Sequence, residues 1–217
     1  MKNVFLCRMI LLTSLSFILV FTSQAREKES DNYRDKNVLI LGLRDNVKSN
    51  YFHKGMITEK TGITENMIDK EYNTIITENI IASTSSKDFG IFIPVSAETS
   101  VYDWANLIKV EGEGDKCFSD VSPIPTDEYR KALNMAGAEY LLVVNQHYLK
   151  WQEKPMRTLF HIVSYTLYDK DQKEVYCGNT YFTSMDIEHP ENLKKISRKA
   201  SSRIASAIVN QIKINEV

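Results

Sequence analysis

Short, continuous apolar runs alternate along the sequence with longer segments of helical periodicity. Residues 38–43 (Val-Leu-Ile-Leu-Gly-Leu) and 89–95 (Phe-Gly-Ile-Phe-Ile-Pro-Val) are rich in branched side chains, which is typical of strands buried on both faces. Apolar residues at helical spacing predict a helix over 66–82 between them. A second helix is predicted to begin at Thr126, a good N-cap residue, and to end at Gly137, which suits a left-handed C-terminal turn. The order up to this point is β-α-β-α.

Three strand patterns and one long helical pattern complete the chain. The strands are predicted over 139–149, 158–168 and 174–183, and polar segments between them predict hairpin loops. Pro190 suits the first position of the last helix. Its apolar stripe is formed by Leu193, Ile196, Ala200, Ile204, Ala207, Ile208 and Ile212. The full order, β-α-β-α-β-β-β-α, predicts a single α/β (α+β) domain over 37–217, with a mixed sheet and a long C-terminal amphipathic helix.

The N-terminal residues 1–25 have the three parts of a secretory signal. Two cations precede an apolar run over residues 9–21, and Ser-Gln-Ala then offers small residues to a signal peptidase. The run is shorter than the roughly 20 residues that span a bilayer as a helix. We expect cleavage near Ala25, a flexible tether over 26–36, and a periplasmic or secreted chain with no integral membrane segment in its mature form. A retained N-terminal anchor is the alternative.

Composition argues against some classes of protein, and the cysteine content predicts a covalent link. A net charge of −1 gives no reason to expect nucleic-acid binding, and a hydrophobic content of 43% argues against disorder. Cys117 and Cys177 form an even pair, which in an oxidising compartment predicts a disulfide. Two unpaired buried thiols are the alternative.

No catalytic or cofactor motif is present in the sequence. The four histidines have no metal-ligand spacing, although His147 and His161 lie on neighbouring predicted strands. We therefore expect no enzyme, no cofactor and no metal. A secreted hydrolase with its site in the 96–125 loop is one alternative. A carrier of a small ligand or lipid, with the aromatic strands as pocket walls, is another.

Aromatic residues are concentrated in the three-strand region, and strand alternation forces some of them outward. Exposed aromatic area is a common device for protein binding. Trp151, in the polar hairpin predicted over 150–157, is the best candidate for a surface anchor. Tyr148 and Trp104 are further candidates for partner binding, and the irregular 96–125 region is a second expected contact region.

Three segments resemble a known group of envelope proteins. They are the first strand at 36–41, the glycine-capped helix running into a strand at 136–143, and the hairpin at 165–176. With the terminal helix, their order is similar to the periplasmic α/β domain of the curli secretion channel subunit, the penicillin-binding-protein activator lipoproteins and the N-terminal domain of the Tol translocation protein. The resemblance implies a non-catalytic domain that binds envelope proteins or assembles with copies of itself. The group shares no catalytic motif that could be matched to residues of this chain.

Overall fold

The computed structural model describes residues 36–84, 92–95 and 101–215, with the backbone alone at Tyr102. The chain from Lys36 onward forms one compact unit. The predicted signal peptide and nearly all of the predicted tether lie outside the described residues. So do the first residues of the strand predicted over 89–95.

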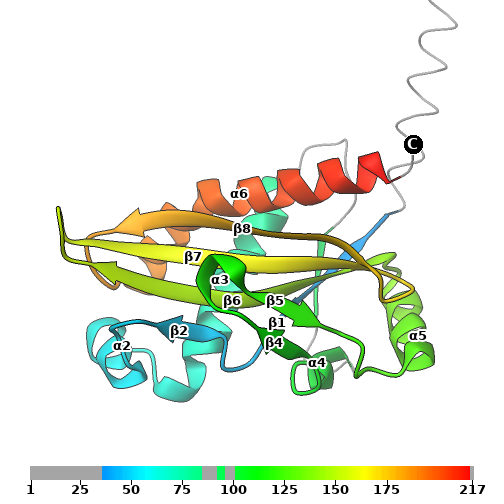
Figure 1. Ribbon diagram of the computed structural model, residues 1–217, viewed down its shortest axis with the longest axis horizontal. Helices are drawn as coiled ribbons and strands as arrows, with labels where there is room; N and C mark the ends of the chain where they lie inside the picture. Colours follow the sequence, from blue (N-terminus) through cyan, green and yellow to red (C-terminus); the bar gives the residue numbers. More distant parts are fainter. Residues whose placement is uncertain (1–35, 85–91, 96–100, 216–217) are drawn as a thin grey trace, which may run out of the picture. The chain divides into compact units, whose positions relative to one another are not determined.

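A mixed β-sheet forms the centre of this unit, as the sequence predicts (Figure 1). Its strands are β1 (Val38–Gly42), β2 (Val47–Ser49), β3 (Phe92–Pro94), β6 (Tyr140–Gln152), β7 (Thr158–Asp169) and β8 (Glu174–Ser184). They follow the order β3-β1-β6-β7-β8, and β2 pairs with β6 off this path. β1 runs parallel to β3 and β6, whereas β6, β7 and β8 form an antiparallel meander.

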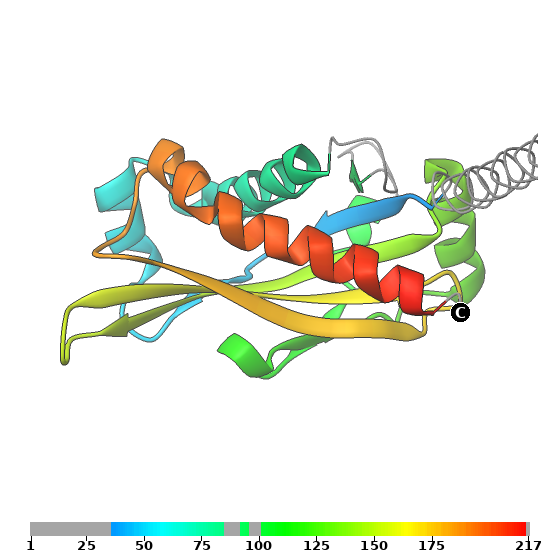
Figure 2. The ribbon, with the colours of Figure 1, turned by 90° about the horizontal axis from the view of Figure 1, so that it is seen from above.

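Helices and a small second sheet pack around these strands. The helices are α2 (Lys54–Thr61), α3 (Ile68–Ser83), α4 (Val101–Trp104), α5 (Thr126–Ala136) and α6 (Pro190–Ile214), with 3-10 turns η1 (Glu65–Met67) and η2 (Gly114–Lys116). β4 (Lys109–Glu111) pairs with β5 (Phe118–Asp120). Figure 2 shows α3 and α6 side by side over one face of the main sheet. The long C-terminal helix is therefore confirmed and covers this face together with α3.

Alternating residues of the central strands build two separate cores. Val38 and Ile40 of β1 pack with α3 and α6, in a cluster that includes Ile204. Leu39 and Leu41 point the other way and pack with α4, α5 and the β5 region. The continuous apolar run of β1 is explained because both of its faces are buried.

A β-bulge between Val144 and Gln146 reverses this alternation within β6. Before the bulge, Leu142 and Val144 lie on the side of α3 and α6. After it, Leu149 lies on that same side, in a third cluster with residues of α2 and α3. In the outer half of β6, which follows the bulge and ends at Gln152, the even-numbered residues consequently point to the opposite side of the sheet.

Two predicted boundaries differ from the structure. β6 continues to Gln152, so Trp151 lies in a strand and not in the hairpin loop predicted over 150–157. The extension is stabilised by pairing with β7 and by Asn50, whose amide bonds both the N–H and the C=O of Trp151. Thr126 is the first residue of α5 and not its N-cap; its hydroxyl donates instead to Gln172 Oε1 (2.7 Å). Gly137 ends α5 in the left-handed conformation, as predicted.

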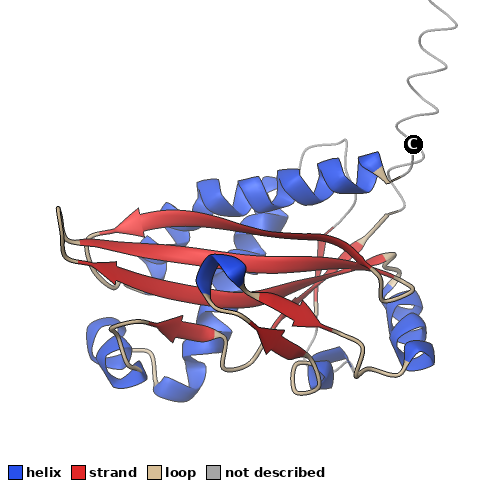
Figure 3. Cartoon of the chain, in the orientation of Figure 1, coloured by secondary structure: helices blue, strands red, loops and turns tan. Residues whose placement is uncertain are grey.

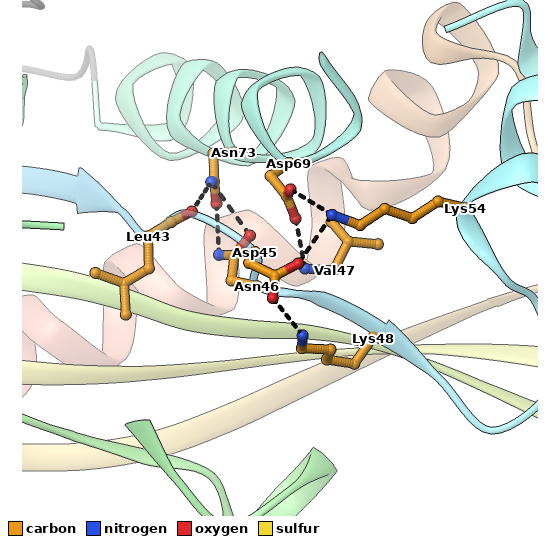
Figure 4. A network of polar contacts seen from close by, with 8 residues as sticks. All are labelled: Leu43, Asp45, Asn46, Val47, Lys48, Lys54, Asp69 and Asn73. Atoms are coloured by element: carbon orange, nitrogen blue, oxygen red, sulfur yellow. Dashed lines mark hydrogen bonds and ion pairs between the residues drawn. The ribbon is translucent and has the colours of Figure 1, made fainter. Parts of the chain in front are cut away.

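A polar network joins the end of β1, the start of β2 and helix α3 (Figure 4). The Asn73 amide donates to the Leu43 carbonyl (2.8 Å) and exchanges hydrogen bonds with the Asn46 amide (3.0 and 3.3 Å). Gly42 makes room for Asn73, because a Cβ at position 42 would lie 2.4 Å from Asn73 Cγ. Asp69, in the first turn of α3, accepts from the Val47 backbone N–H at 2.8 Å. The network fixes the crossing from β1 to β2 against α3.

Basic residues complete the outer side of this network. Lys54 Nζ bridges Asp45 (2.9 Å) and Asp69 (3.2 Å), and Lys48 Nζ contacts Asp45 at 2.8 Å. Hydrogen bonds from Lys48 and Lys54 hold the pKa of Asp45 below its ordinary value. Its side chain is 67% exposed, so this pairing contributes little to stability.

We expect Asn73→Ala to lower the free energy of unfolding by about 1–3 kcal/mol, because it leaves the Leu43 carbonyl and the Asn46 amide without these partners. Urea denaturation at pH 7 measures the loss. Thr74→Ala, at the exposed neighbouring position on α3, is the matched control. Equal losses for the two variants would contradict a structural role for the network.

Candidate functional site

The outer halves of β6, β7 and β8 carry a groove on the sheet face opposite α3 and α6. In Figure 3 this face is towards the viewer, and no helix other than η2 lies in front of the three strands there. The groove, called the sheet groove below, has a volume of about 450 Å³. It is lined by Glu113, Gly114, Asp115, Tyr148, Lys150, Gln152, Phe160, Ile162, Asn179 and Tyr181.

Strand register brings apolar side chains together on the floor of the sheet groove. Tyr148 is paired with Ile162, and Ile162 with Tyr181, so the three form a row across the sheet. Phe160 lies on the same face of β7, two residues before Ile162, and its ring centroid is 6.3 Å from that of Tyr181. Tyr181 is 56% exposed, and the other three side chains are half-buried. Such partly exposed aromatic area in a concave surface is typical of a protein-binding site.

The η2 turn forms one wall of the sheet groove. Gln146 accepts a hydrogen bond from the Gly114 N–H (2.7 Å), and Asn179 donates to the Asp115 carbonyl (3.0 Å). Gly114 has a φ of 63°, and a Cβ there would lie 3.5 Å from the Tyr148 ring. The left-handed φ is the reason that a glycine suits this position, because a Cβ at 3.5 Å would make only an ordinary van der Waals contact with the ring.

Charges of both signs border the aromatic floor. Glu113 and Asp115 are exposed on the η2 wall, and Lys150 is exposed on β6. Burial raises the pKa of Tyr148, and the nearby Glu113 carboxylate raises it further. Tyr148 consequently remains a neutral hydroxyl at physiological pH. The groove presents neutral aromatic surface beside an acidic wall.

The three aromatic residues predicted to bind a partner lie in different places. Tyr148 is in the sheet groove. Trp151 is half-buried on the other face of β6, where its ring is stacked on Tyr51 (6.0 Å between centroids) and meets Phe52 edge-on (5.6 Å). Trp104 is 3% exposed and stacked on Tyr129 at 5.3 Å. A side chain so buried has no surface to offer a partner, so Trp104 belongs to the core in this structure.

Phe160, Ile162 and Tyr181 were not singled out from the sequence, although they form most of the groove floor. Period-two alternation along β7 and β8 places 160, 162 and 181 on one face, and this signal was present in the sequence. The η2 wall lies within the 96–125 region expected to contact a partner, but its position against the sheet depends on Gln146 and Asn179 from distant strands.

The two cysteines are free thiols in the structure, Cys117 buried and Cys177 exposed. The predicted disulfide is therefore not formed here and stays a prediction. Among the described residues, no group of three or more His, Cys, Asp or Glu could share a metal ion. The same part of the chain contains no helix long and apolar enough to cross a membrane.

Comparisons with known proteins give structural likeness only. No protein-family model and no curated protein matches the sequence. The hypothetical protein CT253 from Chlamydia trachomatis is similar over 82% of this chain and 98% of its own, at 10% identity and a TM-score of 0.49. Lipoprotein GNA1162 from Neisseria meningitidis is similar over 82% and 98%, at 12% identity and a TM-score of 0.36.

The C-terminal domain of LpoB from Salmonella enterica is similar over 69% of this chain and 83% of its own, at 11% identity and a TM-score of 0.31. GNA1162 and LpoB fit the broad group of envelope proteins that the sequence resembles, at low identity. At these identities and TM-scores the likeness concerns the order of elements and not an activity.

Proposed function

We propose that the chain is a non-catalytic binding domain of the cell envelope, and that the sheet groove receives a segment of a partner protein. The observation that carries the proposal is the row formed by Tyr148, Ile162 and Tyr181, which lies partly exposed in a concave surface. The secretory pattern of residues 1–25 supports a location outside the cytoplasm.

The lining of the sheet groove indicates the chemistry of the partner segment. Its floor accommodates an apolar or aromatic side chain between Tyr148 and Tyr181. Glu113 and Asp115, on the η2 wall, favour a lysine or arginine beside that side chain. Lys150 and Gln152 on β6 offer polar contacts at the rim. A polypeptide with an apolar anchor next to a cation fits these features.

We expect Tyr181→Ala to weaken partner binding roughly 10-fold to 100-fold, as is typical for the loss of a central aromatic contact. The measurement places a photo-cross-linking amino acid at Gln152 of the tagged full chain in its native cells. Adducts are then quantified by mass spectrometry with and without Tyr181→Ala. The expected result is a defined envelope-protein adduct that is lost in the variant.

Tyr51→Ala is the matched control, because Tyr51 is 55% exposed and lies with Trp151 on the other side of the sheet. This control variant should keep the adduct. A Gln152 adduct that survives Tyr181→Ala, or that disappears equally in both variants, would rule out the sheet groove as the partner site. An adduct consisting of a second copy of the chain would identify the partner as the protein itself.

A further inference from the structure

The η2–β5 segment packs against the sheet face that carries Cys177 of β8. On the sheet face that carries the groove, Cys177 is paired with Thr166, and Asn179 with Ser164. The Asp115 carbonyl is held by Asn179 at 3.0 Å. Cys117 lies two residues after Asp115, and Cys177 lies two residues before Asn179. The two chain segments therefore bring the two cysteines towards each other.

A second set of contacts ties both cysteines to one polar centre. The Asn145 amide donates to the Cys117 carbonyl (3.3 Å) and to the Thr166 hydroxyl (2.8 Å). That hydroxyl in turn donates to Cys177 Sγ at 3.7 Å. Burial is the main reason that the pKa of Cys117 is raised; a hydrogen bond with Ser164 opposes the rise, and the nearby Cys177 adds to it. Ser164 and Cys177 are diagonal neighbours on adjacent strands, so the Cys117 thiol lies within the same small area of the sheet.

We propose that Cys117 and Cys177 form a disulfide that staples the η2–β5 segment to β8, and that the free thiols of this structure are its reduced form. The staple joins two elements that line the sheet groove, the η2 wall and the β8 strand. The proposal does not depend on a partner in the groove. It requires only an oxidising compartment, which the N-terminal pattern of the sequence predicts.

Thiol–disulfide exchange with an external disulfide forms the bond. Cys177 is exposed, so its thiolate attacks the external disulfide first and displaces one thiol from it. Cys117 then loses its proton and attacks Cys177 Sγ, which releases the second thiol. The two cysteines lose two protons and two electrons in total, and the external disulfide is reduced to two thiols. Oxidised glutathione or a disulfide oxidoreductase of the compartment supplies that oxidant.

The bond closes a loop of about 60 residues, which should raise the midpoint of thermal unfolding by roughly 10 °C relative to the reduced protein. It should also slow hydrogen exchange in residues 112–118. The test uses the full chain with Cys7→Ser, so that Cys117 and Cys177 are the remaining cysteines. The protein is equilibrated with oxidised glutathione or with dithiothreitol, and free thiols are counted by maleimide mass shift.

The expected results are complete oxidation to a monomer that takes up no maleimide, a peptide that links residues 117 and 177, and the rise in melting temperature. Cys117→Ser and Cys177→Ser are the matched controls, and neither should show a redox-dependent melting temperature. Any of three results would overturn the proposal: two reactive thiols after oxidation, a disulfide between two molecules, or an unchanged melting temperature in the oxidised protein. None of these readouts involves partner binding, so they are independent of the proposed function.

Discussion

Lowering the pH from 7 to 5 is expected to remove about 4 kcal/mol of unfolding free energy, through two histidines buried in the sheet. His147 and His161 are 4% and 3% exposed, on β6 and β7. Burial lowers the pKa of each to about 3, and for His147 the nearby His161 is a second, smaller cause of the shift. Both side chains are therefore neutral in the folded protein across this pH range.

The sign of the effect follows from which state binds protons. In the unfolded chain each histidine titrates near the ordinary histidine pKa of 6.5, so below that pH the unfolded state gains protons that the folded state does not. Stability is complete above pH 6.5 and is lost as the pH falls towards 3. Each histidine contributes about 1.4 kcal/mol per pH unit within this window, and two histidines over 1.5 units give the expected loss.

The surroundings of His161 show why protonation is costly. Ser184 donates its hydroxyl proton to the Asp186 carbonyl (2.6 Å), so His161 Nε2 must donate to the Ser184 oxygen (2.9 Å). The proton of the neutral ring is therefore on Nε2, and Nδ1 is buried without a hydrogen-bond partner. A second proton on Nδ1 would be a buried cation against Phe182, whose ring is stacked on the imidazole at 4.6 Å.

Urea denaturation at pH 7, 6 and 5 measures this dependence above the range in which carboxylates titrate. His161→Leu should reduce the slope by about half, whatever its effect on stability at pH 7. Thr74→Ala is the control, because position 74 is exposed and the substitution removes no titratable group, so it should leave the slope unchanged. A wild-type stability that is constant between pH 7 and 5 would show that the two histidines are accessible to protons in the folded state.

Strong periodic patterns predicted the framework of the fold well. β1, α3, the three long strands and α6 were expected within a few residues of their observed bounds, because each buries a continuous run or a complete stripe of apolar side chains. Of the short elements, β3 lies within the strand predicted over 89–95, whereas β2, α2 and the small β4–β5 sheet were not predicted. β2 has three residues, and it is a strand because Val47 to Ser49 pair in parallel with the outer half of β6. Such an element depends on a distant partner and leaves no local pattern.

The candidate site was harder to predict because one β-bulge decides which residues face it. Strict alternation from Leu142 and Val144 would put Tyr148 on the buried side with α3 and α6. The bulge at the following residues turns Tyr148 to the open face and brings Leu149 inward. The continuing strand likewise places Trp151 on the side of Tyr51 and Phe52. Apolar composition alone does not locate such a bulge.

Replacing Trp104 by alanine is expected to lower the free energy of unfolding by about 3–5 kcal/mol, which is typical for deleting a large buried aromatic side chain. Trp104 is 3% exposed, and its ring is stacked on Tyr129 with 18° between the planes. Tyr129 is held in turn by a hydrogen bond from its hydroxyl to the Asp169 carbonyl (3.0 Å). The substitution leaves a cavity between α4, α5 and the sheet, and it removes the stacking partner of a buried tyrosine.

Urea denaturation of Trp104→Ala and Trp151→Ala at pH 7 separates a core role from a surface role. Trp151→Ala should cost less, because its side chain is only half-buried. The same two variants are then cross-linked through Gln152 at a temperature where both remain folded. If the Trp104 side chain contributes only to core packing, Trp104→Ala should lose stability but keep the adduct. A Trp104→Ala protein with unchanged stability and a lost adduct would return Trp104 to the partner-binding surface, since only a side chain outside the core can be deleted without a cavity.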